Sequence, residues 1–235
     1  MKRISAIFAA GVILFFFSCG SGGNEKEENK AGDTTAATTV AAPAFTPFKI
    51  FMIEHHVKNF DKWRPVYLAH DSLRQAYGIT KFVTGRGLDD SNMVFVLDKI
   101  SDVQKAKEFA ALPFLKDAMK NAGVTGQPAF SYFDVVRNDD TPIDQKDRIL
   151  MVIKVKDFDA WLKVFDGEKE SRTANGMLDR GIGRGVDDST MLYLAFVVTD
   201  LSKAKARIAS PELKKIMTDS GVEGAPKVYY YRLVD

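Results

Sequence analysis

The chain has 235 residues, with 33 lysines and arginines against 31 aspartates and glutamates, and a formal charge of +2 at pH 7. Lys2 and Arg3 account for this excess, so the remainder of the chain is neutral. Because a nucleic-acid-binding protein needs a cationic surface, we expect no nucleic-acid partner. The single cysteine, Cys19, excludes a disulfide within the chain and, lying far from any candidate base, a thiol enzyme.

Residues 1–18 have the pattern of a signal peptide. A positive start is followed by the apolar run from Ile4 to Phe17, which is too short to span a bilayer as a helix. Cys19 then follows Phe16-Phe17-Ser18, an order that resembles a bacterial lipoprotein cleavage site, although Phe16 stands where leucine is usual. The resemblance implies lipidation of Cys19 and a location in the bacterial cell envelope, lipid-anchored and extracytoplasmic, on the periplasmic or the outer surface. An ordinary signal peptide with an incidental thiol is the alternative.

Residues 19–47 are predicted to form a flexible tether. The segment begins Gly-Ser-Gly-Gly after Cys19, continues through mixed charges and ends in threonine, alanine and proline. With almost no large apolar side chains, it cannot offset the entropy lost on folding. We therefore expect the membrane to be a partner only through the N-terminal lipid.

The remainder of the chain repeats itself at a constant offset of 98 residues. Phe60-Asp61-Lys62-Trp63 returns as Phe158-Asp159-Ala160-Trp161, and residues 85–91 return as residues 183–189 without a gap. The repeats are assigned to residues 48–136 and 147–235, with residues 137–146 as the linker. A position that folding requires should recur, so a position that differs chemically between the repeats is a candidate for function.

Each repeat is predicted to have the element order β-α-β-β-α-β. Asn59 is expected to cap the first helix and Gly78 to end it. In chain order, the predicted elements of the first repeat are strand 50–57, helix 60–77, hairpin strands 81–85 and 93–98, helices 101–111 and 113–122, and strand 128–136 with its proline at the start. Those of the second are strand 149–155, helix 158–175, a hairpin ending at 198, helices within 201–220, and strand 227–234.

This order predicts an α+β fold of two ferredoxin-like repeats, each a four-stranded antiparallel sheet with its helices on one face. Residues 149–153 and 191–198 are continuously apolar rather than alternating, as in strands that are buried on both faces. We therefore expect the two sheets to pack against each other with the helices outside. The result would be an intramolecular dimeric α+β barrel, and the chain would be a monomer.

Residues 53–63, together with His70, Arg74, Gly78 and the Asp89-Asp90 pair, resemble small bacterial proteins of the dimeric α+β barrel superfamily. That superfamily includes antibiotic-biosynthesis-monooxygenase-like domains, which are usually single-repeat chains that dimerise. It also holds cofactor-free oxygenases, haem-degrading enzymes, isomerases and members without known activity. The resemblance therefore implies a fold and leaves the reaction and any cofactor open.

All three histidines lie in the first repeat, at His55, His56 and His70, and their counterparts are an isoleucine, a lysine and a glutamate. His55 shares its strand face with apolar residues, and His70 lies on the apolar face of the first predicted helix. Because neutral imidazole can take or give a proton near pH 7, these two are the candidate catalytic residues. The alternative is that each is a core histidine with one satisfied hydrogen bond, or a half-exposed histidine at the edge of the sheet. His56 is expected to be exposed or structural.

Trp63 and Tyr67 are predicted to line a pocket beside these histidines. Trp63 recurs as a tryptophan, which indicates a core role, whereas Tyr67 carries a hydroxyl that its counterpart Phe165 lacks. Arg74 recurs, which favours a structural salt link. No metal site is expected, since two histidines without a carboxylate on the same faces make a poor ligand set.

Residues 85–87, Gly-Arg-Gly, are predicted to form a hairpin turn rather than a phosphate loop, because they recur and open no helix. The Asp-Asp pair that follows is assigned to the same turn.

Together these features predict an extracytoplasmic lipoprotein whose tandem barrel binds a small, largely apolar molecule. In one hypothesis it is a cofactor-free monooxygenase- or isomerase-like enzyme that uses His55 and His70. In the alternatives it is a non-catalytic ligand-binding protein, or a structural or interaction protein of the envelope.

Overall fold

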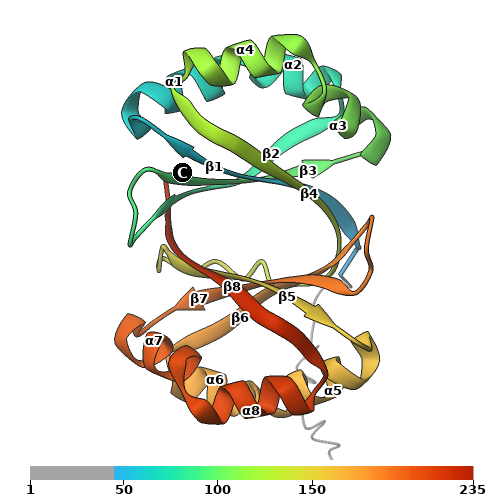
Figure 1. Cartoon of the computed structure of the whole chain (residues 1–235), viewed down its shortest axis with the longest axis vertical. Helices are drawn as coiled ribbons and strands as arrows, with labels where there is room; N and C mark the ends of the chain where they lie inside the picture. The colour runs from blue at the N-terminus through green and yellow to red at the C-terminus, as the bar shows by residue number, and fades with distance from the viewer. Residues whose placement is uncertain (1–44, 235) are drawn as a thin grey trace, which may run out of the picture. The chain divides into compact units, whose positions relative to one another are not determined.

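A computed structural model describes residues 45–234 (Figure 1). The signal peptide, Cys19 and nearly all of the predicted tether lie outside the described residues. The first repeat contains β1 (Phe48–Val57), α1 (Phe60–Ala69), α2 (Asp71–Ala76), β2 (Ile79–Gly87), β3 (Met93–Ile100), α3 (Val103–Ala110), α4 (Pro113–Asn121) and β4 (Val124–Asn138). The second contains β5 (Asp147–Val155), α5 (Phe158–Gly167), α6 (Lys169–Ala174), β6 (Met177–Gly185), β7 (Met191–Val198), α7 (Leu201–Ala209), α8 (Pro211–Asp219) and β8 (Val222–Leu233). None of these helices is both long and apolar enough to cross a membrane.

The strands of residues 45–234 close into one barrel in the order β1-β3-β2-β8-β5-β7-β6-β4. Neighbouring strands are antiparallel throughout, and the helices cover two opposite outer sides (Figure 1). Two seams join the repeats, between β2 and β8 and between β4 and β6. This confirms the α+β class and the packing of two ferredoxin-like sheets with their helices outside.

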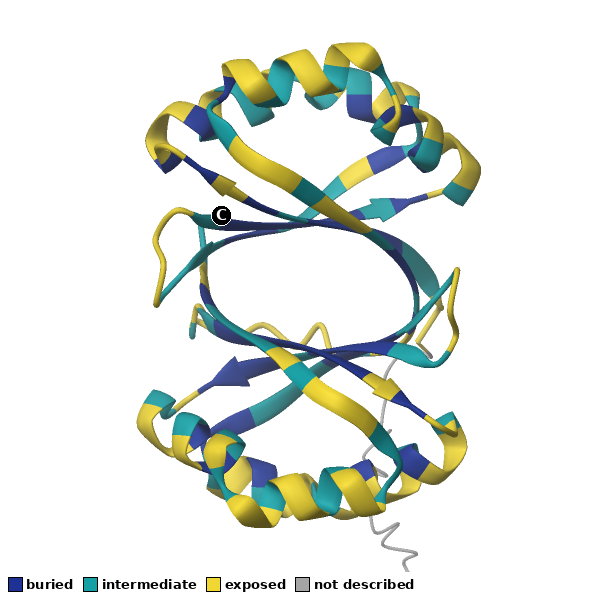
Figure 2. Ribbon diagram, viewed as in Figure 1, coloured by how far each residue is buried: buried dark blue, intermediate teal, exposed yellow. Residues whose placement is uncertain are grey.

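Three apolar cores fill the layers of this barrel. One lies between the sheet and helices of each repeat, and the third fills the barrel interior. Ile149, Met151 and Ile153 face the helices, whereas Leu150 and Val152 between them face the interior. Both faces of β5 are therefore buried, which explains its continuous apolar sequence and the buried strands at the centre of Figure 2.

The predicted helix over residues 60–77 is wrong at one point, because the chain breaks at His70 into α1 and α2. The second repeat breaks at the equivalent Glu168. In both repeats the recurring arginine closes the end of the first helix: Nη1 of Arg74 donates to the Tyr67 carbonyl at 2.6 Å, and Nη1 of Arg172 donates to the Phe165 carbonyl at 2.5 Å. A carbonyl in the last turn of a helix needs such an outside donor. The predicted N-cap is confirmed, since the Asn59 side chain accepts from the Lys62 amide at 2.9 Å.

The last strand of each repeat begins earlier than predicted. β4 begins at Val124, so Pro128 lies inside it and not at its start. The pairing of β4 with β1 shifts register between Glu54 and His56, opposite Pro128. A β-bulge tolerates proline because the missing N–H interrupts no regular ladder bond.

The Gly-Arg-Gly segment is also placed differently from the prediction. Gly85 and Gly87 are strand residues of β2, and the turn itself follows them. A Cβ atom on Gly85 would overlap the ring of Tyr231 across the β2–β8 seam, so the barrel requires glycine there. The aspartate pair does serve the turn, since Asp90 accepts from the Asn92 amide at 2.8 Å.

The recurring lysine and aspartate motifs also connect the two repeats. Lys107 on α3 pairs with Asp187 at 2.6 Å, and its counterpart Lys205 pairs with Asp89, also at 2.6 Å. Both pairs are exposed, so each contributes little to stability. Their symmetry shows that these motifs recur because of contacts between the repeats.

We predict that residues 45–138, expressed alone, will dimerise or aggregate. Without the second repeat, the apolar inner face around Ile50, Met52 and Phe95 is exposed, and β2 and β4 lose their outer partners. Size-exclusion chromatography with light scattering measures the association, with the full-length chain as the control. A monodisperse, cooperatively unfolding monomer of residues 45–138 would contradict the prediction.

Candidate functional site

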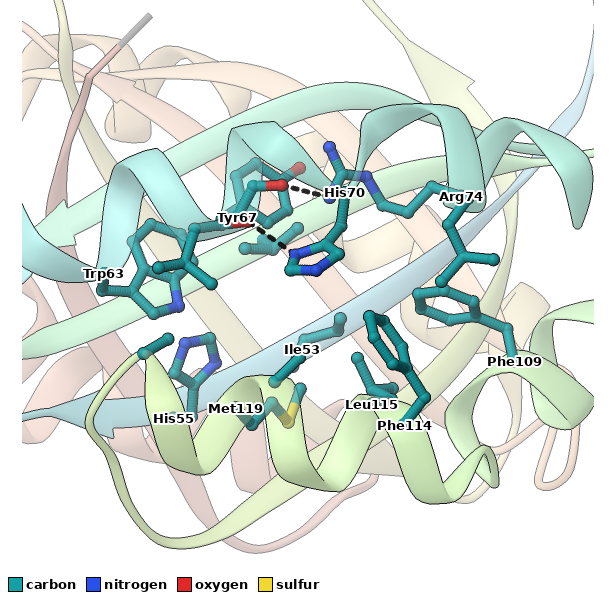
Figure 3. A pocket seen from close by; sticks show the side chains of 15 residues that line it. Ile53, His55, Trp63, Tyr67, His70, Arg74, Phe109, Phe114, Leu115 and Met119 are labelled. Atoms are coloured by element: carbon teal, nitrogen blue, oxygen red, sulfur yellow. Dashed lines mark hydrogen bonds between the residues drawn. The ribbon is translucent and has the colours of Figure 1, made fainter.

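An apolar cavity of about 60 Å³ lies inside the first repeat, between the helix-facing side of the sheet and helices α1, α2 and α4 (Figure 3). All four residues that the sequence assigned to the site, His55, Trp63, Tyr67 and His70, line it. The other lining residues are Ile53, Val66, Leu73, Arg74, Val96, Phe109, Phe114, Leu115, Ala118, Met119 and Ala122.

His55 is a buried imidazole without a partner. It lies on β1 at the bulge opposite β4, is 4% exposed, and neither ring nitrogen has a hydrogen-bond partner among the described residues. Its ring centroid lies 5.4 Å from that of Trp63. Burial, and to a lesser extent the neighbouring His56, lowers the pKa of His55 to about 4, so the ring is neutral at physiological pH.

His70 enters the cavity from the break between α1 and α2 (Figure 3). Its Nδ1 lies 2.7 Å from the Val66 carbonyl oxygen. Because a carbonyl can only accept, Nδ1 must carry the proton, and Nε2 of the neutral ring is then an acceptor. The ring packs edge to face against Phe114 with centroids 5.1 Å apart. No hydrogen bond joins His55 and His70.

A buried polar cluster that the sequence analysis did not identify lies behind the cavity wall. The Tyr67 hydroxyl donates to Asp98 at 3.1 Å, and Nε of Arg74 lies 3.9 Å from the same carboxylate. Asp98 has no exposed surface. Burial raises the pKa of Asp98 to about 6, although Arg74 and the tyrosine hydroxyl act in the opposite direction.

A comparison of the repeats would have revealed Asp98. Its counterpart is Phe196, and the counterpart of Tyr67 is Phe165, so an aromatic pair with ring centroids 6.3 Å apart replaces the tyrosine–aspartate pair. The arginine remains in both repeats. In the second it pairs with Asp179 at 2.6 Å instead, as the predicted structural salt link.

Trp63 is part of the scaffold in both repeats. It is 3% exposed and stacks on Tyr67 with ring centroids 5.0 Å apart. Its counterpart Trp161 lines a second cavity of about 60 Å³ at the equivalent place. In that cavity Glu168 occupies the position of His70 and pairs with Arg207 at 2.7 Å. The histidines therefore distinguish the first cavity from the second.

His56 and Glu54 point away from the cavity. His56 is exposed and lies 3.1 Å from Asp90. Glu54 lies on the other face of β1, where burial raises its pKa and the Tyr229 hydroxyl and Lys227 lower it. Residues 45–234 contain no group of three histidine, cysteine, aspartate or glutamate side chains that could hold a metal ion. A cavity of about 60 Å³ also has no room for a haem.

No protein-family model and no curated protein sequence matches this chain. The structure is similar to a candidate monooxygenase from Lactobacillus acidophilus, with 17% identity and a TM-score of 0.50 over 79% of this chain and 94% of that chain. A candidate monooxygenase from Fusobacterium nucleatum gives 13% identity and a TM-score of 0.51 over 80% and 93%. An anthrone oxidase-like protein gives 11% identity and a TM-score of 0.54 over 80% and 92%.

These alignments extend over both repeats, and they confirm the resemblance to monooxygenase-like dimeric α+β barrels at the level of the fold. At such low identities they establish the fold and no shared reaction.

We predict that His55 and Asp98 give opposite pH dependences to stability. The stabilisation that the lowered pKa of His55 gives to the folded state is fully present above the unfolded pKa of 6.5. It is lost as the pH falls through the folded pKa of about 4. The stabilisation that the raised pKa of Asp98 gives to the folded state is fully present below the unfolded pKa of 3.8. It is lost as the pH rises through the folded pKa of about 6. Each shift corresponds to about 3 kcal/mol, so the two largely cancel in the wild type.

Urea denaturation between pH 4 and 7 separates them. The free energy of unfolding of His55→Ile should fall as the pH rises, because only the Asp98 contribution remains. That of Asp98→Asn should rise with pH, because only the His55 contribution remains, whereas the wild type changes little. Asp117→Asn, a change at an exposed site on α4, is the control and should leave the wild-type profile unchanged. Parallel profiles for all four proteins would contradict the assigned shifts.

Proposed function

We propose that this protein binds a small, largely apolar molecule that carries one polar group, in the cavity of the first repeat. The apolar walls would hold the body of the ligand, and His55 would hydrogen-bond its polar group. The observation that supports this is the imidazole of His55, which lines the cavity and whose two ring nitrogens have no hydrogen-bond partner among residues 45–234. Both nitrogens are buried, so a ligand has to displace neighbouring side chains to reach them. A buried polar group without a partner costs about 1–3 kcal/mol, a cost that a ligand would remove.

The pKa of His55 favours binding over proton abstraction by this residue. General-base catalysis is most efficient when the pKa of the base is near the working pH. With a pKa of about 4, His55 is a much weaker base than an ordinary histidine. As a neutral ring it can still donate or accept a hydrogen bond.

A second candidate function is a cofactor-free oxygenation or isomerisation in the same cavity, with His70 as the base. One observation favours it: the hydrogen bond from Nδ1 to the Val66 carbonyl orients the ring and leaves Nε2 as the acceptor. A base held by a third group in this way is the usual arrangement in proton-transfer sites. The fold that the chain shares with monooxygenase-like proteins is consistent with this activity.

Entry of a ligand larger than a few atoms requires α4 to move. Four lining residues, Phe114, Leu115, Ala118 and Met119, come from α4, which has no fully buried residue and no side-chain N-cap bond. Phe114 is 49% exposed. A helix with so few buried contacts opens at low cost compared with the strands below it.

We predict saturable binding of phenol, reported by Trp63 fluorescence in a Trp161→Phe background, where Trp63 is the single tryptophan. His55→Ile should weaken phenol binding about tenfold, the worth of one hydrogen bond, and leave benzene binding unchanged. Loss of oxygen uptake with phenol in His70→Gln, at unchanged affinity, would instead support the enzymatic function.

Two matched variants control this experiment. Val66→Phe fills the first cavity, and Val164→Phe makes the equivalent change in the second. Phenol binding should disappear in Val66→Phe and persist in Val164→Phe. Equal binding to both variants would place the ligand elsewhere and refute the proposal.

We further propose that the protein is a lipid-anchored, extracytoplasmic protein of the bacterial envelope, and that the barrel is monomeric. The support is the sequence around Cys19, followed by a polar segment before the first strand. Metabolic labelling with an alkyne fatty acid should modify the wild type and not Cys19→Ala. Equal labelling of the two proteins, or none in either, would exclude acylation at this cysteine.

A further inference from the structure

The interior of the barrel is chemically asymmetric. Five positions that face the barrel interior differ between the repeats. At three of them an apolar residue of the first repeat is replaced by a polar residue in the second, and at two by a smaller one. The pairs are Val83 and Gly181, Ile50 and Arg148, Phe95 and Tyr193, Leu97 and Ala195, and Phe133 and Tyr231. Because the first-repeat residues show what the fold requires at these positions, the changes in the second repeat need another explanation.

These differences coincide with a cavity of about 240 Å³, four times the volume of the cavity around His55. Arg148, Tyr193 and Tyr231 contribute buried polar side chains, and Phe82, Leu97 and Ala195 are among its apolar walls. Four more polar residues, Asn138, Asp139, Asp140 and Arg180, also line it. The small Ala195 leaves space that leucine would occupy, whereas a Cβ atom on Gly181 would lie 3.2 Å from the Tyr193 hydroxyl. This cavity lies on the inner side of the sheets, away from the helices.

Arg148 is a buried cation that forms no ion pair with another residue of the described part of the chain. It is 5% exposed, and its Nη1 donates to the carbonyl oxygens of Gln145 at 2.5 Å and Asp147 at 3.0 Å. Among residues 45–234, no carboxylate lies within 4.0 Å of its guanidinium. A charge buried in this way is costly unless an anion pairs with it. The two bonds use one nitrogen of a group that has five N–H donors.

The other charged residues that line this cavity are Arg180 and two exposed aspartates, Asp139 and Asp140. Arg180 donates to the Thr141 carbonyl at 2.7 Å and lies 3.8 Å from Asp139. Asp140 accepts from the Asn138 side chain at 2.8 Å. Arg148 is therefore the buried charge of this cavity that has no ion-pair partner among residues 45–234.

We propose that the barrel interior binds a small organic carboxylate, with its anionic end paired to the guanidinium of Arg148 and its apolar body against Phe82, Leu97 and Ala195. The planar guanidinium matches a carboxylate in bidentate geometry. The hydroxyls of Tyr193 and Tyr231 are neutral donors, because burial raises the pKa of both tyrosines. A phosphate dianion suits the site less well, since the second arginine is already paired.

This site is separate from the cavity around His55, so the two proposals can fail independently. The test is calorimetric titration of the purified full-length protein at pH 7 with sodium benzoate as the probe. Benzamide, which has the same shape without the charge, and inorganic phosphate, which has the charge without an apolar body, are the comparison ligands. Benzoate should bind saturably, and both comparison ligands should bind at least tenfold more weakly.

Three variants locate the binding. Arg148→Ile introduces the residue found at the equivalent position of the first repeat and should weaken benzoate binding at least tenfold. Ala195→Leu, also the first-repeat residue, keeps the charge, fills the space and should abolish binding. Arg184→Gln removes a half-buried arginine outside this cavity and should bind as the wild type does.

The proposal is overturned if the wild type shows no saturable benzoate binding, or if Arg148→Ile binds as tightly as the wild type. Arg148 would then serve only to hold the carbonyls of Gln145 in the linker and Asp147 at the start of β5. Thermal unfolding checks that each variant is folded. If Arg148→Ile does not fold, Ala195→Leu decides, because wild-type affinity in that variant also overturns the proposal.

Discussion

The structure depends on one constraint: each four-stranded sheet has two apolar faces and two open edges, and its own helices cover only one face. The second repeat supplies what is missing. Its sheet covers the exposed face, and the β2–β8 and β4–β6 seams close the edges. Glycine at position 85 follows from this closure, since the Tyr231 ring of the other repeat lies over it. The reciprocal lysine–aspartate pairs follow from it as well.

Duplication also allows the two halves to diverge in chemistry while both keep the same fold. Where the second repeat buries Phe165 and Phe196, the first buries Tyr67 hydrogen-bonded to Asp98. Both pairs occupy equivalent positions, but only the Tyr67–Asp98 pair of the first repeat is polar. A buried carboxylate requires nearby donors, so the tyrosine and the aspartate have to occur together. The barrel interior shows the reverse asymmetry, with Arg148 in the second repeat opposite an isoleucine in the first.

Two of the buried arginines, Arg74 and Arg148, and the buried His55 illustrate different uses of a low-dielectric interior. Arg74 is surrounded by the carboxylates of Asp71 and Asp98 and by the ring of Tyr67, so its charge is compensated within the fold. Arg148 has no carboxylate partner among residues 45–234, and it lines the cavity inside the barrel. His55 has no hydrogen-bond partner among those residues, and it lines the cavity between the sheet and the helices of the first repeat. We assign ligands to these two residues because each is a buried polar group that lacks a protein partner among residues 45–234 and lines a cavity.

The sequence alone determined the repeat, the order of elements, the barrel and the helix boundaries at Asn59 and Gly78, because those depend on local pattern and on apolar strands that need cover on both faces. It also placed His55 and His70 on apolar faces. Only the tertiary structure decided that both line one cavity, that Asp98 lies beneath it, that the helix breaks at His70 and that Arg148 is unpaired. Each of these depends on distances between side chains from different elements, which no spacing along the chain encodes.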